Sequence, residues 1–282
     1  MRRLTFTNAR GESVVFYRSP FFIERLSGIG EVNADLQGQR SPYMDGETYI
    51  DTILHPRFVD LEGAITYRDL SEIKQARSQI IRVCNPKLGL GRITLEMDGD
   101  IKEIMGVPDG VPVFPERGEG VYQQFMVTFK CPNPYWQDLT SISRDLRAYE
   151  GKFTFPFEFP VQFGIEGDST TITNAGNADA SVILTIQGPV RNPMVINQTT
   201  GQYIRVLRSI QSNETLYIDT NPYSKKVEIR RGSAIIKAMG SLDHDSDFWQ
   251  LVVGPNRIRY VADEGVEEAV VSIHWRSMYT GV

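Results

Sequence analysis

Cysteine, histidine and long apolar runs are all scarce in this chain of 282 residues. The only two cysteines, Cys84 and Cys131, lie too far apart in sequence for a disulfide framework or a paired metal motif, so we expect two reduced, buried thiols. No apolar run approaches the ~18 residues of a membrane helix, and residues 1–5 do not lead into the apolar stretch of a signal peptide. The expected protein is made in the cytoplasm without an export signal and does not insert into a membrane.

Positive charge is also in short supply. Lysine and arginine number 30 against 35 aspartates and glutamates, which gives a net charge of −5. Proteins that bind nucleic acid usually carry a basic patch, so sequence-specific nucleic-acid binding is not predicted.

Apolar residues make up 41% of the chain, which is enough to bury a core in each of two ordinary domains.

The sequence lacks the usual catalytic motifs. Its three histidines are widely separated, and no Gly-x-Ser-x-Gly elbow, Walker loop or His-Glu-x-x-His motif occurs. Asp243, Asp245 and Asp247 are spaced like the start of a calcium loop, but the later glycine and glutamate of that loop are missing. A solvated turn is therefore favoured over a cation site, and we predict no catalytic, metal-binding or cofactor-binding residue.

The first half of the chain alternates strand patterns with turn residues. Period-two patterns predict strands at 4–6, 14–17, 21–26, 56–67, 92–97, 101–107 and 121–130. Residues 27–53 contain several glycines and a proline but few alternating positions, so we expect a long loop that reaches a neighbouring molecule. A second exposed loop is expected at Asp109.

One amphipathic helix is expected among these strands. Asp69 can cap its N-terminus, and Glu72 stands three residues later at the capping-box spacing. Asn85-Pro86 ends the helix. Its apolar stripe is predicted at Leu70, Ile73, Ala76 or Arg77, Ile80, Ile81 and Cys84. A helix of about four turns suits one face of a small antiparallel sheet, which makes the first unit α+β.

The strand at 121–130 leads into a segment with two prolines. Pro132 and Pro134 cannot donate hydrogen bonds to a sheet, so the strand should end here. Tyr135 and Trp136 follow at once, and we interpret two large rings after such a stop as a plug packed between two bodies. These four residues are the expected domain seam, with an N-terminal domain over residues 1–136.

The rest of the chain predicts a linker and a β-sandwich. Residues 137–163 should form a linker and extended edge segment, in which Phe153, Phe155, Phe157 and Phe159 pack within the chain rather than against a second subunit. Residues 164–282 show strand patterns at 171–173, 181–187, 193–197, 202–210, 215–219, 226–230, 234–238, 248–251, 257–261 and 269–275. Short strands with turn signals every ~8 to 12 residues and no convincing helix are typical of an antiparallel sandwich.

A set of short motifs follows one another along the whole chain. They are YMDGETY at 43–49, the helix closing on Asn85-Pro86, FKCPNPYW at 129–136, TNAGNA at 173–178, IQGPVRNP at 186–193, ETLYIDT at 214–220 and GPNRI at 254–258. Each motif is weakly specific alone, but the ordered set is specific. Together they resemble the distal tail proteins of long-tailed siphophages, the family that forms the central ring of the baseplate.

This resemblance implies a mainly β fold, with an N-terminal β-sandwich bearing one α-helix (α+β) followed by a C-terminal galectin-like antiparallel β-sandwich. It implies a structural role at the tail tip of the virion, with no enzymatic activity. The implied partners are further copies of the chain in a hexameric ring, the tail tube protein, the tail-tip hub or tail-associated lysin, and a receptor-binding protein. The candidate ring and tube contacts are Asp45, Gly46, Tyr49 and Asp109.

Two alternative functions compete with this structural role. A lectin-like module would bind host cell-wall polysaccharide through exposed rings such as Tyr223 or Trp249. An enzyme that cleaves polysaccharide would need a pair of carboxylates in differing environments, and no such pair can be singled out. The structural role is therefore preferred.

Overall fold

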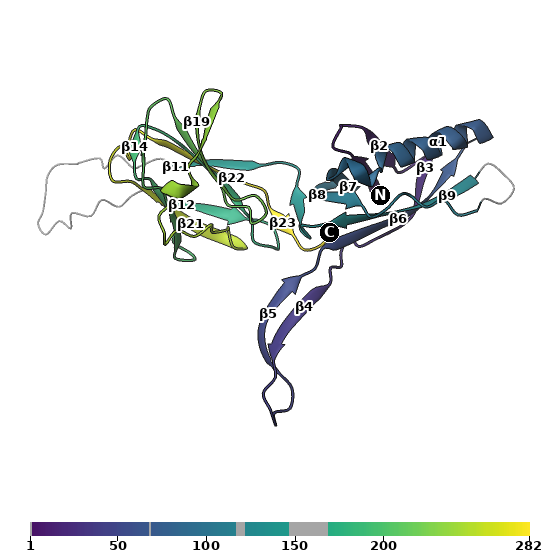
Figure 1. Ribbon diagram of the computed structural model, residues 1–282, viewed down its shortest axis with the longest axis horizontal. Helices are drawn as coiled ribbons and strands as arrows, with labels where there is room; N and C mark the ends of the chain where they lie inside the picture. The colour runs from purple at the N-terminus through teal and green to yellow at the C-terminus, as the bar shows by residue number, and fades with distance from the viewer. Residues whose placement is uncertain (1, 68, 117–121, 147–168) are drawn as a thin grey trace, which may run out of the picture. The chain divides into compact units, whose positions relative to one another are not determined.

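The computed structural model describes residues 2–67, 69–116, 122–146 and 169–282 and divides into two compact units (Figure 1). The N-terminal unit comprises Met1–Leu139 together with Tyr279–Val282, and the C-terminal unit comprises Thr140–Met278. The chain therefore passes from one unit to the other twice. Within the described ranges, no helix has the length and apolar character needed to cross a membrane.

The N-terminal unit is built on one antiparallel sheet. Its strands are β1 (Arg2–Thr7), β2 (Ser13–Phe16), β3 (Phe21–Ser27), β6 (Arg57–Thr66), β7 (Gly91–Met97), β8 (Asp100–Pro108), β9 (Tyr122–Cys131) and β10 (Trp136–Asp138). The main strand order is β2-β1-β7-β8-β9-β6-β3, and β10 pairs with β8. The two end strands meet at a short turn, where the Tyr17 N–H donates to the Phe21 carbonyl oxygen at 2.8 Å.

The core of this unit collects alternate side chains from its strands. Along β9 the buried positions are Gln123, Phe125, Val127, Phe129 and Cys131, as the period-two pattern predicts. The rings of Phe6 and Phe129 lie 4.7 Å apart between centroids. Cys84 and Cys131 are both buried free thiols, and burial raises the pKa of each to about 12.

The predicted helix is α1 (Leu70–Val83), followed by the short 3-10 turn η1 (Pro86–Leu88). Asp69 occupies the N-cap position but makes no side-chain capping bond, so the capping-box prediction is wrong. The buried face consists of Ile73, Ala76, Ile80 and Val83. Leu70 and Ile81 are 52% and 41% exposed, because the helix rests on the sheet along a narrower stripe than predicted.

The predicted long loop at 27–53 contains a hairpin, which corrects that expectation. Its strands are β4 (Ala34–Gln39) and β5 (Thr48–Leu54), and they form a two-stranded sheet separate from the main sheet. Figure 1 shows both strands extending away from β3 and β6. Nearly every residue of this hairpin is exposed, so the sequence carries no alternation of buried and exposed side chains to reveal its strands.

The C-terminal unit contains two larger antiparallel sheets, as expected for a sandwich. Its elements are β11 (Ile142–Leu146), β12 (Ser169–Asn174), β13 (Val182–Gln187), β14 (Val190–Arg191), β15 (Met194–Asn197), β16 (Gln202–Arg205), β17 (Ser209–Ile210), β18 (Thr215–Asp219), β19 (Lys226–Arg231), β20 (Ala234–Lys237), η2 (Met239–Ser241), β21 (Gly254–Val261) and β22 (Val270–Trp275). The sheet orders are β11-β22-β13-β18-β19-β20 and β12-β21-β15-β16, with β14 and β17 paired separately. β23 (Met278–Tyr279) lies at the second passage between the units.

One predicted strand of this unit, 248–251, is not a strand. Within the segment, Leu251 forms a single antiparallel bridge with Ala180, with backbone hydrogen bonds of 2.9 and 2.8 Å. The next residue, Val252, is held by the Asn256 side-chain amide, which donates to the Val252 carbonyl oxygen at 2.7 Å and accepts from the Val252 N–H at 3.0 Å. The Asn197 amide donates to the Gln250 carbonyl oxygen at 3.3 Å. The predicted strand at 202–210 is also interrupted, between β16 and β17.

Part of the predicted linker lies outside the described residues. Within 137–163, residues up to 146 belong to β10 and β11, whereas the segment with Phe153, Phe155, Phe157 and Phe159 is not described. The predicted domain limits at 136 and 163 stay predictions. The mainly β architecture with one α-helix in the described part of the chain is confirmed.

Candidate functional site

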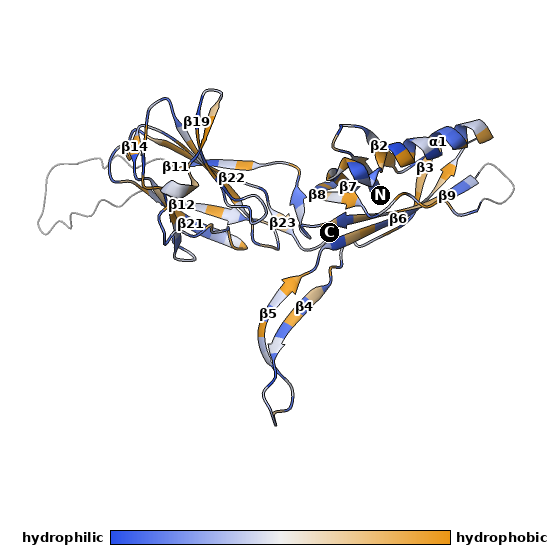
Figure 2. Ribbon diagram, in the orientation of Figure 1, coloured by the Kyte–Doolittle hydropathy of each residue, from blue (hydrophilic) through white to orange (hydrophobic). Residues whose placement is uncertain are grey.

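The hairpin of residues 34–54, called the arm below, is almost wholly exposed, more so than any other helix or strand of the N-terminal unit that the structure describes. Its large apolar side chains are open to solvent, namely Leu36 (67% exposed), Tyr43, Met44 (51%), Tyr49 (64%), Ile50 (61%) and Ile53 (51%). Figure 2 shows apolar segments on both of its strands. Among the described residues, β4 and β5 pair only with each other. An exposed concentration of apolar residues of this kind marks an interaction surface.

A β-bulge brings two of these side chains, Leu36 and Tyr49, to the same face of the arm. The register of the two strands shifts between Gln37 and Gly38, so that Gly38 pairs with Tyr49 and Ile50 is the extra residue. The hydroxyls of Tyr49 and Thr52 lie 2.9 Å apart in a hydrogen bond, which places Tyr49 on the face of Thr52. Leu36 pairs with Thr52, so the Leu36 and Tyr49 side chains share this face.

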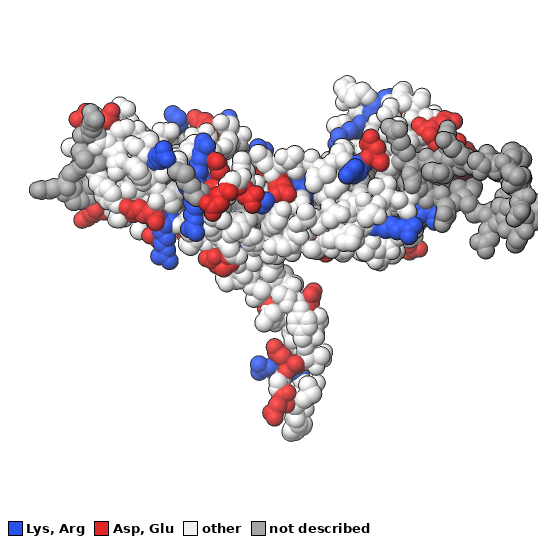
Figure 3. All heavy atoms as spheres, turned by 180° about the vertical axis from the view of Figure 1, so that it is seen from behind, with Lys and Arg blue, Asp and Glu red and all other residues white. Residues whose placement is uncertain are grey.

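The arm is also acidic. It carries four carboxylates, those of Asp35, Asp45, Glu47 and Asp51, against a single cation, Arg40. The Arg40 guanidinium lies 3.5 Å from the Glu47 carboxylate, which leaves three acids without a cation on the arm itself. Figure 3 shows more red than blue along the arm. A partner surface that accepts the arm should therefore be basic.

The root of the arm, residues 28–31 and 55–57, is held by a buried arginine. Arg57 is 1% exposed, and its guanidinium donates to five backbone carbonyl oxygens, those of Pro134 (2.7 Å), Gly28 (2.8 Å), Glu31 (2.8 Å), Ile29 (3.2 Å) and Thr280. Burial lowers the pKa of Arg57, although the side chain stays a cation at any ordinary pH. The planar fork of arginine suits this many acceptors better than a lysine would.

The backbone at the root also requires a glycine. Gly28 has a φ of +78°, and a Cβ placed on it would lie 1.7 Å from the Phe58 carbonyl oxygen. Its N–H donates to the Glu31 carboxylate at 2.9 Å, and this hydrogen bond is the largest cause of the lowered pKa of Glu31. The Trp136 indole N–H donates to the Ile29 carbonyl oxygen at 3.0 Å. The root is thus fixed from both sides of the turn.

The last four residues of the chain pack beside this root. The Val282 N–H donates to the Ile29 carbonyl oxygen at 3.3 Å. Lys102 lies 2.7 Å from the Asp138 carboxylate and 4.4 Å from the centroid of the Tyr279 ring, and the Tyr279 hydroxyl donates to Asp138 at 3.2 Å. Chain segments separated by more than 200 residues therefore meet at one end of the arm.

The structure gathers only some of the predicted site residues. Asp45, Gly46 and Tyr49 all lie on the arm and are exposed, whereas Asp109 follows β8, where its N–H donates to the Thr128 carbonyl oxygen at 2.8 Å. Arg57 was missed by sequence reasoning, because nothing in its local pattern reveals a buried cation that binds carbonyl oxygens from distant segments.

The residues predicted for the seam contribute to the N-terminal unit. Trp136 is fully buried in its core, and the Pro134 carbonyl oxygen accepts from Arg57. The Tyr135 N–H donates to the Asn133 side chain at 3.1 Å, and Pro132 is exposed before it. Their role as a plug between two bodies stays a prediction.

The lectin alternative loses one of its two aromatic candidates. Trp249 is 1% exposed, so it cannot stack on a sugar, whereas Tyr223 is 62% exposed. Over the described ranges, no group of three or more histidines, cysteines, aspartates or glutamates is arranged to hold a metal ion. The turn at Asp243, Asp245 and Asp247 is solvent-exposed or half-buried.

Comparison with known proteins places the chain in a family. Residues 9–131 match the phage tail protein RIFT-related domain, and residues 175–279 match the siphovirus-type tail component, C-terminal domain. The crystal structure of SPP1 Dit, described as a paradigm of the hub adsorption apparatus in phages that infect Gram-positive bacteria, has a TM-score of 0.70 at 12% identity over 98% of both chains.

A second solved structure shares the fold. A chain of the phage P2 baseplate in its activated conformation with Ca has a TM-score of 0.55 at 12% identity over 97% of this chain and 98% of that one. No match was found among curated proteins. The two family models match consecutive parts of the chain, in the order of the two units, and both describe phage tail components. The chain therefore belongs to the distal tail protein family of siphophages, whose members are structural components of the phage tail and baseplate.

Proposed function

We propose that this protein forms a hexameric ring in the baseplate that joins the tail tube to the tail-tip hub or tail-associated lysin. The N-terminal domain, over residues 1–136, builds the ring through the arm. The C-terminal domain, over residues 164–282, offers attachment sites for a receptor-binding protein. The observation that carries this proposal is an arm with a fixed root and an exposed apolar, acidic surface.

The physical argument concerns the stability of the arm. An isolated two-stranded hairpin is marginally stable in water, and the arm has no third strand among the described residues. Burial of its apolar side chains against a partner would add stabilisation of about 1.5 to 3 kcal/mol for each large side chain. Contact between two different patches of identical chains generates a closed ring when the rotation permits. The arm is therefore best suited to contacts made on assembly.

The relatives support the same setting. SPP1 Dit is described as part of a hub adsorption apparatus, and the second solved structure is a phage baseplate. In such an assembly, the acidic balance of this chain favours free passage of DNA over binding to it. The proposed protein is made in the host cytoplasm, acts in the virion as scaffolding and catalyses no reaction.

Electron microscopy of the chain co-expressed with its neighbouring tail proteins tests this function. We expect a six-fold ring between the tube and the hub. Ala34 and Leu54 pair across the base of the arm, so replacing residues 35–53 with Asn-Gly closes the chain by a two-residue turn and leaves the root intact. This variant should remain monomeric in light scattering. Tyr223→Ala, in the C-terminal unit, is the control, and an unchanged ring without the arm would refute the proposal.

A further inference from the structure

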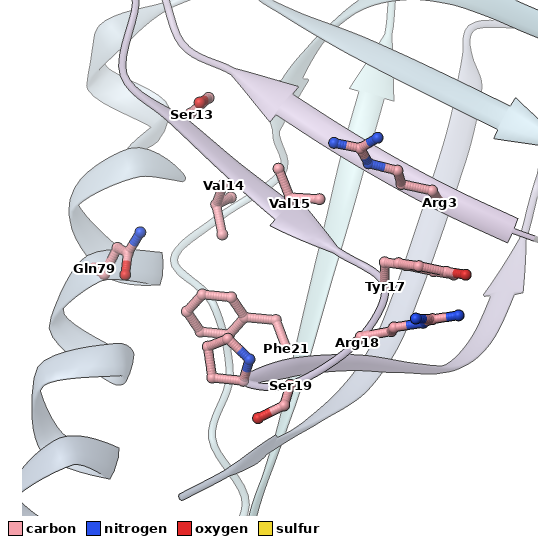
Figure 4. A pocket seen from close by; sticks show the side chains of 10 residues that line it. Arg3, Ser13, Val14, Val15, Tyr17, Arg18, Ser19, Phe21 and Gln79 are labelled. Carbon is pink, nitrogen blue, oxygen red and sulfur yellow. The ribbon is translucent and has the colours of Figure 1, made fainter.

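A pocket of 440 Å³ lies on the N-terminal unit, between the end strands of the sheet and the helix (Figure 4). Val14, Val15 and Phe21 provide its apolar wall, and Gln79 of α1 lines one side. The pocket opens where β2 and β3, the two ends of the strand order, are connected by the turn at 17–21 rather than by a continuous ladder. A side chain of another molecule has room to enter here.

The charges of this pocket are of one sign. Arg3 and Arg18 line it, and no lining residue is a carboxylate. The Arg3 guanidinium lies 3.3 Å from Glu96 in an exposed ion pair. Arg18 lies 4.9 Å from the centroid of the Tyr17 ring and has no acidic partner within the ranges that the structure describes. Arg18 is thus available to pair with a carboxylate from outside the chain.

The tip of the arm carries complementary groups. Tyr43 is fully exposed and has a φ of +65°, which is uncommon for a bulky residue and marks local backbone strain. Met44 is 51% exposed, and the carboxylate of Asp45 follows it. An exposed aromatic ring beside a flexible apolar side chain and an acid has the composition of an anchor in a protein interface.

We propose that the tip of the arm, residues 42–46, seats in this pocket on the next copy of the chain. Tyr43 and Met44 pack against Val15 and Phe21 of the neighbour, and Asp45 pairs with its Arg18. This inference rests on the proposed ring, for which it names the receiving surface. Complementary charge selects the occupant, because the arm is acidic and the pocket is basic.

The positions of tip and pocket favour a contact between copies. The arm begins beyond Ser27, at the end of β3, whereas the pocket lies at Phe21, where β3 starts. No residue of the arm lines the pocket of its own chain. Each copy therefore offers one tip and one pocket on different surfaces, and the contact is head-to-tail, the kind that closes into rings.

Cross-linking provides the direct test. Ser41→Cys and Ser13→Cys place one thiol beside the tip and one at the exposed rim of the pocket, while Cys84 and Cys131 are buried and do not react. Baseplates assembled from the double variant and treated with a short bismaleimide should give a ladder up to six linked chains on a denaturing gel. Each single variant should give no ladder.

Charge reversal separates this inference from the function on which it rests. Arg18→Glu and Asp45→Arg should each lower the yield of rings about tenfold, and both together in one chain should restore it. Arg25→Glu, an exposed cation on β3 outside the pocket, should have no effect. Rings that form normally with Arg18→Glu and give no ladder would overturn the pocket but not the ring. Absence of rings from the unaltered chain would overturn both.

Discussion

The root and the tip of the arm differ in which groups they bury and which they expose to solvent. At the root, a guanidinium and an indole are buried, and their N–H groups are matched to backbone carbonyl oxygens. At the tip, Tyr43 and Met44 face solvent, and Asp45 has no cationic partner on the arm. The root therefore has the character of a protein core, and the tip has the character of an unoccupied interface.

The difference between root and tip explains how a two-stranded hairpin can act in assembly. A two-stranded hairpin is too weak to set its own direction, so the direction must come from its attachment. A fixed root reduces the conformational freedom that the arm loses on binding, and pre-organisation of this kind strengthens association. Substitutions at the root should therefore lower stability strongly, whereas substitutions of the exposed side chains at the tip should act mainly on assembly.

The largest effect is expected from Arg57→Ala. Five carbonyl oxygens would lose a donor and a buried cavity would open, so the free energy of unfolding of the N-terminal unit should fall by about 4 kcal/mol. Arg57→Lys should recover only part of this loss, since an ammonium lacks the planar fork. The change in the free energy of unfolding is measured by urea unfolding, with hydrogen exchange of the β6 amides as the local readout.

Arg25→Ala is the control for this substitution. Its side chain is 69% exposed and lies 3.8 Å from Glu62, so its removal should change the free energy of unfolding by less than about 0.5 kcal/mol. If Arg57→Ala proved as mild as this control, the root would not be the anchor of the arm.

Two glycines allow the root and the tip to be compared with one substitution. Gly28 and Gly46 have similar φ values, +78° and +80°. A Cβ at Gly28 meets the Phe58 carbonyl oxygen, whereas a Cβ at Gly46 has nothing within 4 Å. Gly46→Ala should cost about 1 kcal/mol of local strain, and Gly28→Ala should cost about 3 kcal/mol because the backbone must also move.

Thermal unfolding of both alanine variants checks this pair. Gly28→Ala should lower the midpoint of the N-terminal unit clearly more than Gly46→Ala does. Equal shifts of the two unfolding midpoints would mean that the backbone at the root accommodates a Cβ as readily as the backbone at the tip. The contrast between root and tip would then be lost.

A smaller effect is expected from Trp136→Phe. The Ile29 carbonyl oxygen would lose its shortest donor but keep the longer bonds from Arg57 and Val282. We expect a loss of about 1 to 2 kcal/mol, seen as faster hydrogen exchange at the root of the arm. Trp249→Phe, in the C-terminal unit, removes a comparable N–H and should leave exchange at the root unchanged.

Sequence patterns predict the parts of this molecule that have one buried face. The strand β9 and the hairpin of β7 and β8 around Asp98-Gly99 were predictable, because alternation and a turn with positive φ are local signals. The arm was not, since strands exposed on both faces show no alternation. Residues 248–251 had the apolar composition of a strand, but Leu251 forms a single bridge, with Ala180, and the Gln250 carbonyl oxygen accepts from the Asn197 side chain.

The root of the arm could not be predicted from local sequence patterns either. Its acceptors come from residues 28–31, from Pro134 and from Thr280, which meet only in the folded chain. Gly28 could be recognised as a glycine in a turn, but not as one pressed against the Phe58 carbonyl. The exposed residues Asp45, Gly46 and Tyr49 could be predicted from the sequence because they belong to one contiguous motif.

The smallest effect concerns pH and the single acid of the root. The Glu31 carboxylate accepts from the Gly28 N–H, which lowers the pKa of Glu31 below its ordinary value of 4.5. Because the folded chain holds this proton more weakly than the unfolded chain, the carboxylate stabilises the fold above pH 4.5, and this contribution is lost as the pH falls from 4.5 through the lowered pKa. Its exposure to solvent keeps the effect small.

Glu31→Gln should therefore be less stable than the unaltered chain at pH 7, and this difference should shrink as the pH falls from 4.5 through the lowered pKa of Glu31. Hydrogen exchange at Gly28, corrected for the intrinsic pH dependence of exchange, measures this difference. Glu47→Gln is the matched control on the outer part of the arm, where the carboxylate lies 3.5 Å from the Arg40 guanidinium, and it should leave exchange at the root unchanged. A difference between Glu31→Gln and the unaltered chain that did not shrink as the pH fell below 4.5 would show that the charge of Glu31 does not hold the root, and the anchoring would then rest on Arg57 and Trp136 alone.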